Sequence, residues 1–258
     1  MEMAGFSRFL GVLRLFTPDA PAWTVPAIAD ALGVPASTVY RTVRDLVGGG
    51  FLEQSAEASY RLGPAFIEFD RSLRLTDPLV AAGRPVLHDV VMQAHVPCAA
   101  MLARFYNGSV MCVADEAAAE TPFRSSYERG RPMPLTRGST SKVVLAHLPP
   151  RQFNRLIESH SESPSNVASL RAELAEIRKR GYCSTASEID AGLAGISAPV
   201  IVKEAGLIAS LSIVAHDAGI DEGQRRRLIL LVVSAASLLT EDLRRRTESA
   251  AGAIRKVA

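Results

Sequence analysis

Cysteine and lysine are both scarce in this chain of 258 residues, and each scarcity has a consequence. The three cysteines, Cys98, Cys112 and Cys183, are widely spaced and form no Cys-x-x-Cys pair or Cys/His cluster, so we expect no structural zinc site. Buried, reduced thiols are the simpler interpretation. Only four of the 29 basic residues are lysines. The others are arginines, whose forked guanidinium suits phosphates and guanine edges.

Long hydrophobic runs are also missing. The longest, LILLVVSAASLL at 228–239, is shorter than the roughly 20 residues that span a bilayer, so it predicts a buried helix. The opening MEMAGFSRFL has no basic stretch followed by an apolar one, and we expect no signal peptide. The sequence therefore predicts a cytoplasmic protein without a membrane partner.

A strong excess of one charge is absent as well. The net charge of +2 excludes a uniformly basic nucleic-acid coat protein but allows a locally basic surface. With 48% hydrophobic and 22% charged residues, the chain predicts a well-packed core, and its length fits one large domain or two smaller ones. Residues 1–66 contain five arginines and six acidic residues. DNA binding by this segment would therefore depend on local charge placement and on pairing two copies.

Helical periodicity organises the first part of the chain. Residues 6–16 place apolar side chains at helical spacing. A second short helix is predicted between Thr24, a capping residue, and Gly33, a residue that ends helices. The stretch GVPASTVYRTVRDLVGGG at 33–50 predicts a third helix directly after this turn. A hairpin follows, with short strands at 51–53 and 59–62.

The third helix has two different faces. At about 100° per residue, apolar residues from Val39 to Leu46 gather on one side, and Ser37, Arg41 and Arg44 lie opposite. A helix, tight turn, helix and hairpin in this order are typical of a winged helix-turn-helix, whose second helix lies in the DNA major groove. Hydroxyls and arginines on that helix reach base edges or phosphates. The predicted DNA-binding residues are Ser37, Thr38, Tyr40, Arg41, Arg44 and, in the hairpin, Arg61.

The remainder of the chain predicts an α+β fold. An amphipathic helix at 65–77, stopped by Pro78, precedes a mixture of helices and strands. The dipeptide Asn107-Gly108 marks a hairpin between two of the strands. Helices are predicted at 79–94, 137–148, 150–158, 165–180 and 221–246, and strands at 98–105, 109–114, 195–203 and 207–215.

Four stretches, in this order, resemble the IclR family of bacterial transcriptional regulators: TVPAIADALGVPASTVYRTVRDLVGGGFLE, YRLGPAFIEF, PLTRGSTSKVVLAHLPP and RKRGYCSTASEIDAGLAGISAPV. The resemblance covers nearly the whole chain. It implies a winged helix-turn-helix at 1–64, a linker helix at 65–78, and an effector-binding and oligomerisation domain with a GAF-like or profilin-like sheet at 79–258. It also implies a repressor or activator that binds palindromic double-stranded operator DNA as a dimer or tetramer. We expect no cofactor, no metal and no enzymatic activity.

The segment LTRGSTSKVV combines a glycine and several hydroxyls with a helix start. Backbone N–H groups at a helix N-terminus carry partial positive charge and favour a carboxylate, to which Ser139 and Thr140 can add donors. In the family that the chain resembles, this segment lines the site of a small organic acid. The resemblance extends the effector site to Thr185, Leu193, Gly195, Ser212 and Val214.

Departures from the family pattern bear on the ligand. Some members carry an acidic residue in place of Thr185, a cysteine in place of Gly195 and a serine in place of Val214. A less polar and more open pocket is therefore expected, suited to a flat aromatic carboxylate rather than to glyoxylate or pyruvate. Further candidates are Met101, Met111 and Val113 as apolar walls, for which the alternative is ordinary core, and Arg124 and Arg137 as carboxylate partners, for which the alternative is an exposed salt bridge.

Other interpretations are weaker on sequence grounds. Ser139 to Lys142 fits the S-x-x-K pattern of acyl enzymes, but no S-D-N or K-T-G partner accompanies it. No P-loop is present, and the five histidines have no triad-like company. Arg41 and Arg44 are also compatible with simple solvation. Two function classes stay open: an effector-responsive DNA-binding regulator, and a small-molecule enzyme or sensor whose helix-turn-helix contacts only protein.

Overall fold

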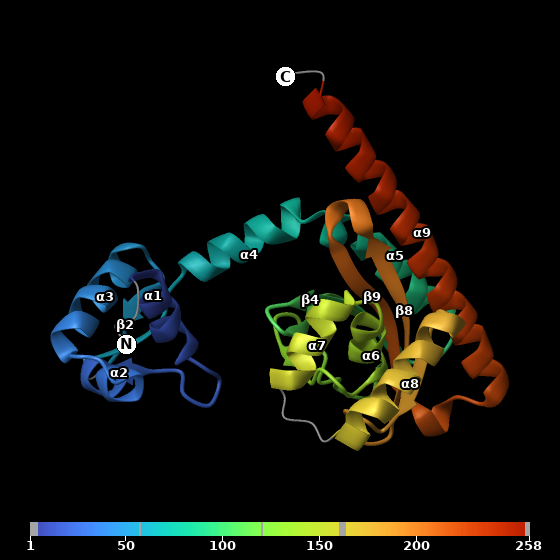
Figure 1. The fold of residues 1–258 in the computed structure, drawn as a ribbon, viewed down its shortest axis with the longest axis horizontal. Helices are drawn as coiled ribbons and strands as arrows, with labels where there is room; N and C mark the ends of the chain where they lie inside the picture. The colour runs from blue at the N-terminus through green and yellow to red at the C-terminus, as the bar shows by residue number, and fades with distance from the viewer. Residues whose placement is uncertain (1–4, 57, 120, 160–163, 256–258) are drawn as a thin grey trace. The chain divides into compact units, whose positions relative to one another are not determined.

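The computed structural model describes residues 5–56, 58–119, 121–159 and 164–255. The chain forms two compact units, residues 1–76 and residues 77–258, which are described separately (Figure 1). The first unit contains α1 (Gly5–Arg14), β1 (Trp23–Thr24), α2 (Val25–Leu32), α3 (Ala36–Gly48), β2 (Leu52–Gln54), β3 (Ser59–Leu62) and α4 (Ala65–Thr76).

Local signals explain how α2 and α3 are joined. The side chain of Thr24 accepts a hydrogen bond from the backbone N–H of Ala27 and caps α2. Gly33 ends α2 with a φ of 63°, a left-handed conformation that glycine adopts without steric cost. The helix-turn-helix and the hairpin predicted from the sequence are confirmed. Strand β1 was not predicted, and it pairs Trp23 with Tyr60 to make the hairpin a three-stranded sheet.

The core of the first unit lies between its three N-terminal helices and the start of the hairpin. Val12, Ile28, Val39, Val43 and Leu46 are all buried there. The last helix of the unit is anchored by aromatic contacts, because the Phe51 ring lies 5.6 Å from that of Phe66 and 5.8 Å from that of Phe69. These contacts connect α4 to the end of α3 and the start of the wing.

The second unit has an α+β fold, as predicted. Its helices are α5 (Pro78–Ala94), α6 (Ser139–Ala146), α7 (Pro150–Ser159), α8 (Pro164–Arg180) and α9 (Glu222–Arg255). Its strands are β4 (Cys98–Tyr106), β5 (Ser109–Ala117), β6 (Pro132–Met133), β7 (Cys183–Ala186), β8 (Leu193–Val202) and β9 (Leu207–His216). Two short edge strands, β6 and β7, were not predicted, because neither has the alternating apolar pattern of a longer strand.

The six strands form one antiparallel sheet in the order β6-β5-β4-β9-β8-β7. Helices α5 and α9 lie against one face, and α6, with α7 and α8 beyond it, lies against the other (Figure 1). Each face therefore has its own apolar core. The arrangement leaves the N-terminus of α6 beside the edge hairpin β7–β8, where the candidate pocket lies.

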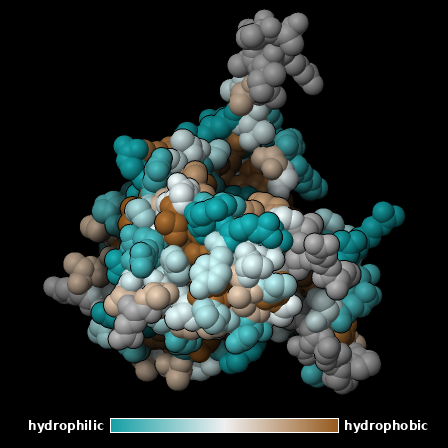
Figure 2. Space-filling model, turned by 90° about the vertical axis from the view of Figure 1, so that its left-hand side faces the viewer, coloured by the Kyte–Doolittle hydropathy of each residue, from teal (hydrophilic) through white to brown (hydrophobic). Residues whose placement is uncertain are grey.

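The surface is mixed in polarity. Figure 2 shows mostly hydrophilic and intermediate side chains on the face in view, with hydrophobic side chains in small areas between them. Several exposed apolar side chains belong to α4, where Ile67 is 74% exposed and Leu75 is 63% exposed. Within the described residues, no helix combines the length and the hydrophobicity needed to cross a bilayer.

Candidate functional site

The polar face of α3 is exposed as its helical spacing predicts. Ser37, Tyr40, Arg41 and Arg44 are exposed, while Thr38 is half-buried. The opposite face is held in the core and contains Thr42, Val43 and Leu46 among its buried residues. Buried packing thus fixes the orientation of the helix and leaves a row of hydroxyl and guanidinium groups free to meet a surface outside the unit.

The arginines of this unit differ in their electrostatic partners. Arg61 Nε lies 2.7 Å from Glu53 Oε1 across the hairpin, and Arg44 Nε lies 3.6 Å from Asp45 Oδ1. In the part of the chain that the structure describes, Arg41 has no ion-pair partner. Of the three, Arg41 is therefore the most available to an external phosphate or base.

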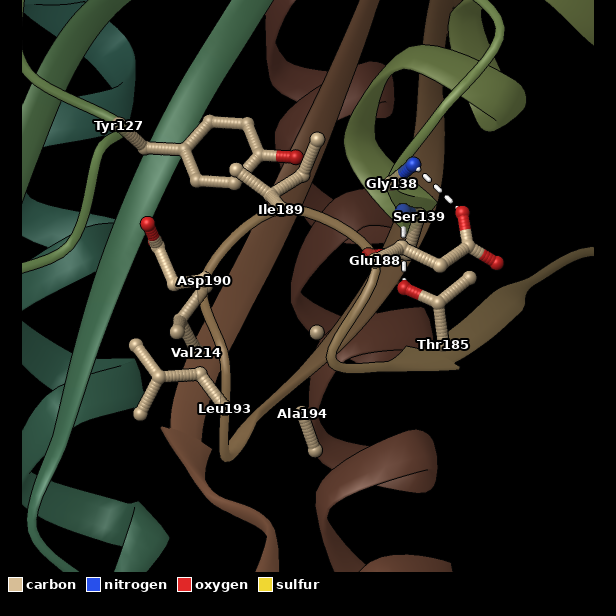
Figure 3. A pocket seen from close by; sticks show the side chains of 11 residues that line it. Tyr127, Gly138, Ser139, Thr185, Glu188, Ile189, Asp190, Leu193, Ala194 and Val214 are labelled. Carbon is tan, nitrogen blue, oxygen red and sulfur yellow. Dashed lines mark hydrogen bonds between the residues drawn. The ribbon is translucent and has the colours of Figure 1, made fainter.

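A narrow pocket lies at the N-terminus of α6 in the second unit (Figure 3). Its cavity volume is about 20 Å³, which is room for roughly one water molecule. The pocket is lined by Tyr127, Gly138, Ser139, Thr185, Glu188, Ile189, Asp190, Leu193, Ala194, Gly195 and Val214.

Five of the residues predicted for the effector site line this pocket: Ser139, Thr185, Leu193, Gly195 and Val214. Two others lie behind its wall, since Thr140 and Ser212 are buried and Thr140 Oγ1 donates to Ser212 Oγ at 3.0 Å. Their hydroxyls bond α6 to the sheet, and neither residue is part of the lining of the closed cavity. Direct contact of these two residues with an effector stays a prediction.

The predicted apolar walls also need correction. Met101 is buried beside Val214 in the cluster beneath the pocket but does not line the cavity. Met111 and Val113 belong to the core on the opposite face, against α5 and α9, because alternate residues of β5 point to opposite sides of the sheet. They are core residues and do not wall the pocket.

The two predicted arginines are exposed. The guanidinium of Arg137 donates to the backbone carbonyl of Glu188, and Arg124 lies in the loop before α6. Arg137 and Arg131 line an outer hollow of about 450 Å³, which shares Glu188 and Ile189 with the narrow pocket. The loop between β7 and β8 thus separates the inner cavity from this hollow. Neither Arg124 nor Arg137 lines the inner cavity.

The N-terminus of α6 is already occupied by the chain's own side chains. The backbone N–H of Gly138 donates to Glu188 Oε2 at 2.8 Å, and that of Ser139 donates to Thr185 Oγ1 at 3.2 Å. Glu188 was not singled out from the sequence, although it lies within a stretch that carries the family resemblance. The sequence predicted a weakly polar and open pocket, whereas two carboxylates and three hydroxyls line the closed cavity.

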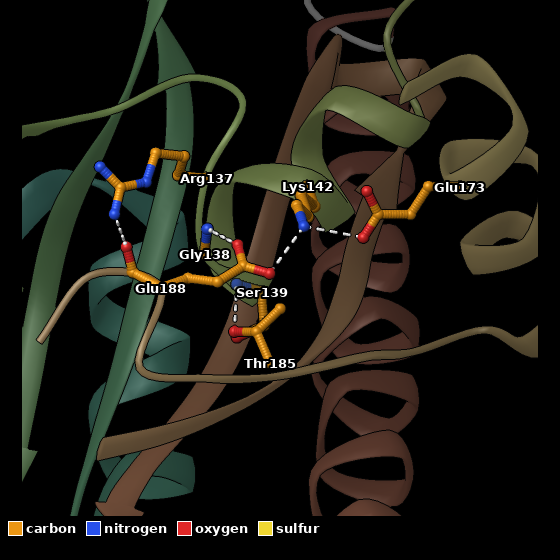
Figure 4. Close-up of polar contacts among 7 residues, drawn as sticks. All are labelled: Arg137, Gly138, Ser139, Lys142, Glu173, Thr185 and Glu188. Carbon is orange, nitrogen blue, oxygen red and sulfur yellow. Dashed lines mark hydrogen bonds and ion pairs between the residues drawn. The ribbon is translucent and has the colours of Figure 1, made fainter. Parts of the chain in front are cut away.

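Lys142 lies one turn into α6 and is nearly buried. Its Nζ lies 2.7 Å from Glu173 Oε1 and 2.8 Å from Glu188 Oε1 (Figure 4). Burial by itself lowers the pKa of Lys142, but the hydrogen bonds to both glutamates and their charges outweigh it and raise the pKa above 10.5. Lys142 is therefore protonated and unable to act as the base of an S-x-x-K acyl enzyme.

Two further residues of the pocket were missed from the sequence. Tyr127 is buried, and burial raises its pKa to about 12, so its phenol stays neutral and can donate a hydrogen bond. Asp190 accepts a hydrogen bond from the backbone N–H of Ser126 at 2.9 Å. Within the described residues, no group of His, Cys, Asp and Glu side chains is arranged to hold a metal.

Comparisons with known proteins agree with this architecture. Residues 77–240 match the family model for the bacterial transcriptional regulator IclR C-terminal domain, and residues 6–56 match the IclR helix-turn-helix domain. The HTH-type transcriptional regulator KipR of Bacillus subtilis is 24% identical over 221 residues, covering 83% of this chain and 87% of the relative. The Pca regulon regulatory protein of Pseudomonas putida is 21% identical over 220 residues, covering 83% and 75%.

A solved structure shares the fold. The crystal structure of an IclR homolog from Microbacterium hydrocarbonoxydans, complexed with 4-hydroxybenzoate, superposes with a TM-score of 0.75 at 24% identity, covering 93% of this chain and 99% of that one. The two family models together match both units of the chain. The protein therefore belongs to the IclR family of bacterial transcriptional regulators, with a helix-turn-helix domain and a C-terminal effector domain.

Proposed function

We propose that this regulator binds palindromic operator DNA through α3 and its wing, and that a small aromatic carboxylate bound in the second unit controls that binding. The regulated genes form a catabolic operon for such acids. The observation that carries the DNA-binding part is the exposed face of α3, where Arg41 stands without an ion-pair partner among the described residues. Arg44 and Ser37 extend the same face, and Arg61 adds a backbone contact from the wing.

The effector class is supported by the relatives and by the pocket. One relative is a Pca regulon regulatory protein, and a structural neighbour was crystallised with 4-hydroxybenzoate. In this chain, the backbone N–H of Gly138 at the α6 N-terminus and the protonated amine of Lys142 already bind one carboxylate, that of Glu188. Both favour a carboxylate, and Leu193 and Val214 supply apolar contacts for a ring.

Effector binding changes DNA binding by shifting the equilibrium between two arrangements of an oligomer. An acid that binds one arrangement more tightly shifts the equilibrium by no more than its differential affinity. The exposed apolar side chains of α4, Ile67, Phe69, Leu73 and Leu75, support a dimer in which this helix meets a second copy. In this proposal, α4 transmits the change in spacing to the winged domains.

The DNA-binding proposal is tested by fluorescence anisotropy on the intergenic DNA next to the protein's own gene. We expect specific binding with a steep salt dependence, because arginines displace counterions from phosphates. Arg41→Ala should weaken operator binding by about 10- to 100-fold, as expected for loss of one base or phosphate contact. Unchanged affinity in folded Arg41→Ala would reject α3 as the recognition helix and favour an enzyme or sensor whose helix-turn-helix contacts only protein.

The effector proposal is tested by calorimetry with benzoate, 4-hydroxybenzoate and protocatechuate. Ser139→Ala should weaken binding of whichever acid binds the wild type, since Ser139 lines the cavity at the start of α6. Exposed Ser37→Ala, in the other unit, is the matched control and should leave acid binding unchanged. Equal affinities in Ser139→Ala and wild type would place the effector elsewhere.

A further inference from the structure

The contacts around α6 lead to one further property of the effector site, which rests on the function proposed above. We propose that Glu188 is an internal carboxylate that occupies the position of the effector's own carboxylate. The effector then binds only by displacing the loop of residues 187–192, which connects β7 and β8. Glu188 thereby acts as an intramolecular competitor.

The Glu188 side chain has the geometry of a bound acid. One carboxylate oxygen accepts from the Gly138 N–H at 2.8 Å, and the other lies 2.8 Å from Lys142 Nζ. A bound organic acid would need the same two donors, a helix N-terminal N–H on one oxygen and an ammonium group on the other. Figure 4 shows the Glu188 side chain reaching between these two donors.

The charges around Lys142 also favour replacement of Glu188 by the effector's carboxylate over binding of the effector beside Glu188. Lys142 already faces two carboxylates, those of Glu173 and Glu188. Asp190, on the same loop, also lines the pocket. A further carboxylate added beside Glu188 would meet like charges at short range, which disfavours its ionised form. Exchange of Glu188 for the effector keeps the number of charges beside Lys142 unchanged.

The cavity is too small for the effector while the loop is closed. Its volume of about 20 Å³ is far below the roughly 150 Å³ of a cavity that accepts a benzene ring. A Cβ built on Gly138 would lie 2.4 Å from Tyr127 Oη and 2.8 Å from Ile189 Cγ1, so these two side chains close tightly over the helix start (Figure 3). An aromatic ring therefore requires Ile189 to move, and Ile189 follows Glu188 directly in the loop.

The loop of residues 187–192 is held together by hydrogen bonds, and it also borders the outer hollow. Asp190 accepts a hydrogen bond from the Ser126 N–H, and the ends of the loop are joined by a hydrogen bond from the Ser187 N–H to the Leu193 carbonyl at 2.8 Å. Glu188 and Ile189 form the wall between the inner cavity and the outer hollow. Displacing them joins the two spaces, and the exposed arginines of the hollow attract an incoming anion.

Hydrogen exchange of the full-length protein tests this assignment without the effector. Glu188→Ala should raise amide exchange at Gly138 and across residues 187–192 by about tenfold or more, as loss of a charge-assisted hydrogen bond predicts. Sodium acetate should restore protection at Gly138, whereas sodium chloride at equal ionic strength should not. Glu173→Ala, which removes the other partner of Lys142, is the matched control and should show neither effect. Unchanged exchange in Glu188→Ala, or equal acetate protection in both variants, would overturn the proposal.

Glu188→Gln provides a second variant that preserves side-chain size. Its preference for 4-hydroxybenzoate over the neutral 4-hydroxybenzyl alcohol should rise by about tenfold relative to wild type, because one competing charge is gone. If the wild type binds no aromatic acid but acetate protects Glu188→Ala, the effector class is wrong and the internal carboxylate stands. If 4-hydroxybenzoate binds without altering exchange of residues 187–192, and with equal preference in Glu188→Gln, the internal carboxylate is rejected and the effector class stands.

Discussion

Gly195 and Ser139 approach each other so closely that a Cβ on Gly195 would lie 2.6 Å from Ser139 Oγ. The same Ser139 oxygen accepts a hydrogen bond from Ser197 Oγ at 2.8 Å, so it cannot rotate away without breaking that bond. The lack of a side chain at Gly195 in β8 therefore makes room for the hydroxyl of Ser139, the first residue of α6. This pair fixes how closely the helix N-terminus sits on the sheet.

Gly195→Ala should destabilise the second unit by about 1–2 kcal/mol, because Ser139 must abandon its buried hydrogen bond. Ser139→Ala leaves its Cβ 3.7 Å from the new methyl group, an ordinary contact, so the double variant should cost less than the sum of the single variants. Urea unfolding of the four proteins measures the coupling. Additive costs would show that the two residues do not constrain each other.

Thr42→Val should destabilise the first unit by about 1–2 kcal/mol while leaving the surface of α3 unchanged. The buried Thr42 hydroxyl accepts from Arg8 Nε at 3.1 Å and donates to the Thr38 carbonyl at 3.1 Å, and valine keeps only the shape. Chemical denaturation followed by Trp23 fluorescence measures the change. Exposed Ser37→Ala should shift stability by less than about 0.5 kcal/mol, and a similar effect in both variants would contradict this assignment.

Lys142→Met should be strongly destabilising, near the lower end of the about 3–5 kcal/mol seen when one member of a buried ion pair is removed. The lower end applies because Glu173 and Glu188 keep 40% and 30% of their side-chain surface exposed. The folded-state pKa of Lys142 is raised, so its contribution is fully present below its ordinary pKa of 10.5 and is lost as the pH rises through the higher folded value. The stability difference from wild type should stay constant between about pH 7 and 9 and shrink only in stronger alkali.

The three thiols should resist modification in the folded protein. Burial raises the pKa of Cys98 to about 11 and those of Cys112 and Cys183 to about 12. A rise of two units or more reduces the reactive thiolate by about a hundredfold at neutral pH. Ellman's reagent should therefore label the native chain very slowly and all three thiols at once in urea. Rapid labelling of the native protein would show that one of these sites opens.

Regular periodicity explains which parts of the fold could be predicted. Helix α3 has a single apolar face set by residues such as Val39 and Leu46, and its partners lie next to it in the sequence. The longer strands β4, β5, β8 and β9 were predicted in the same way. Strands β1, β6 and β7 were missed because they have two to four residues and exist only through pairing with distant segments.

The candidate pocket was only partly predictable. The glycine and hydroxyls around Ser139 identified the helix start. Met111 and Val113 were candidates for pocket walls with ordinary core as the alternative, and the structure shows that they belong to the core. The sequence shows that successive side chains of β5 point to opposite faces of the sheet. Only the packing of the helices decides which of these faces meets the pocket and which meets α5 and α9. Glu188 lies 46 residues from Lys142 in the chain, so no local pattern could reveal their ion pair.

The sequence by itself determined the helix-turn-helix, the polar face of α3 and the α+β character of the second unit, because these depend on residues close together along the chain. The tertiary structure alone decided what occupies the N-terminus of α6. Folding brings the β7–β8 loop against that helix, where the carboxylate of Glu188 accepts a hydrogen bond from the Gly138 N–H and pairs with Lys142. Long-range packing, and not local sequence, therefore closed the pocket.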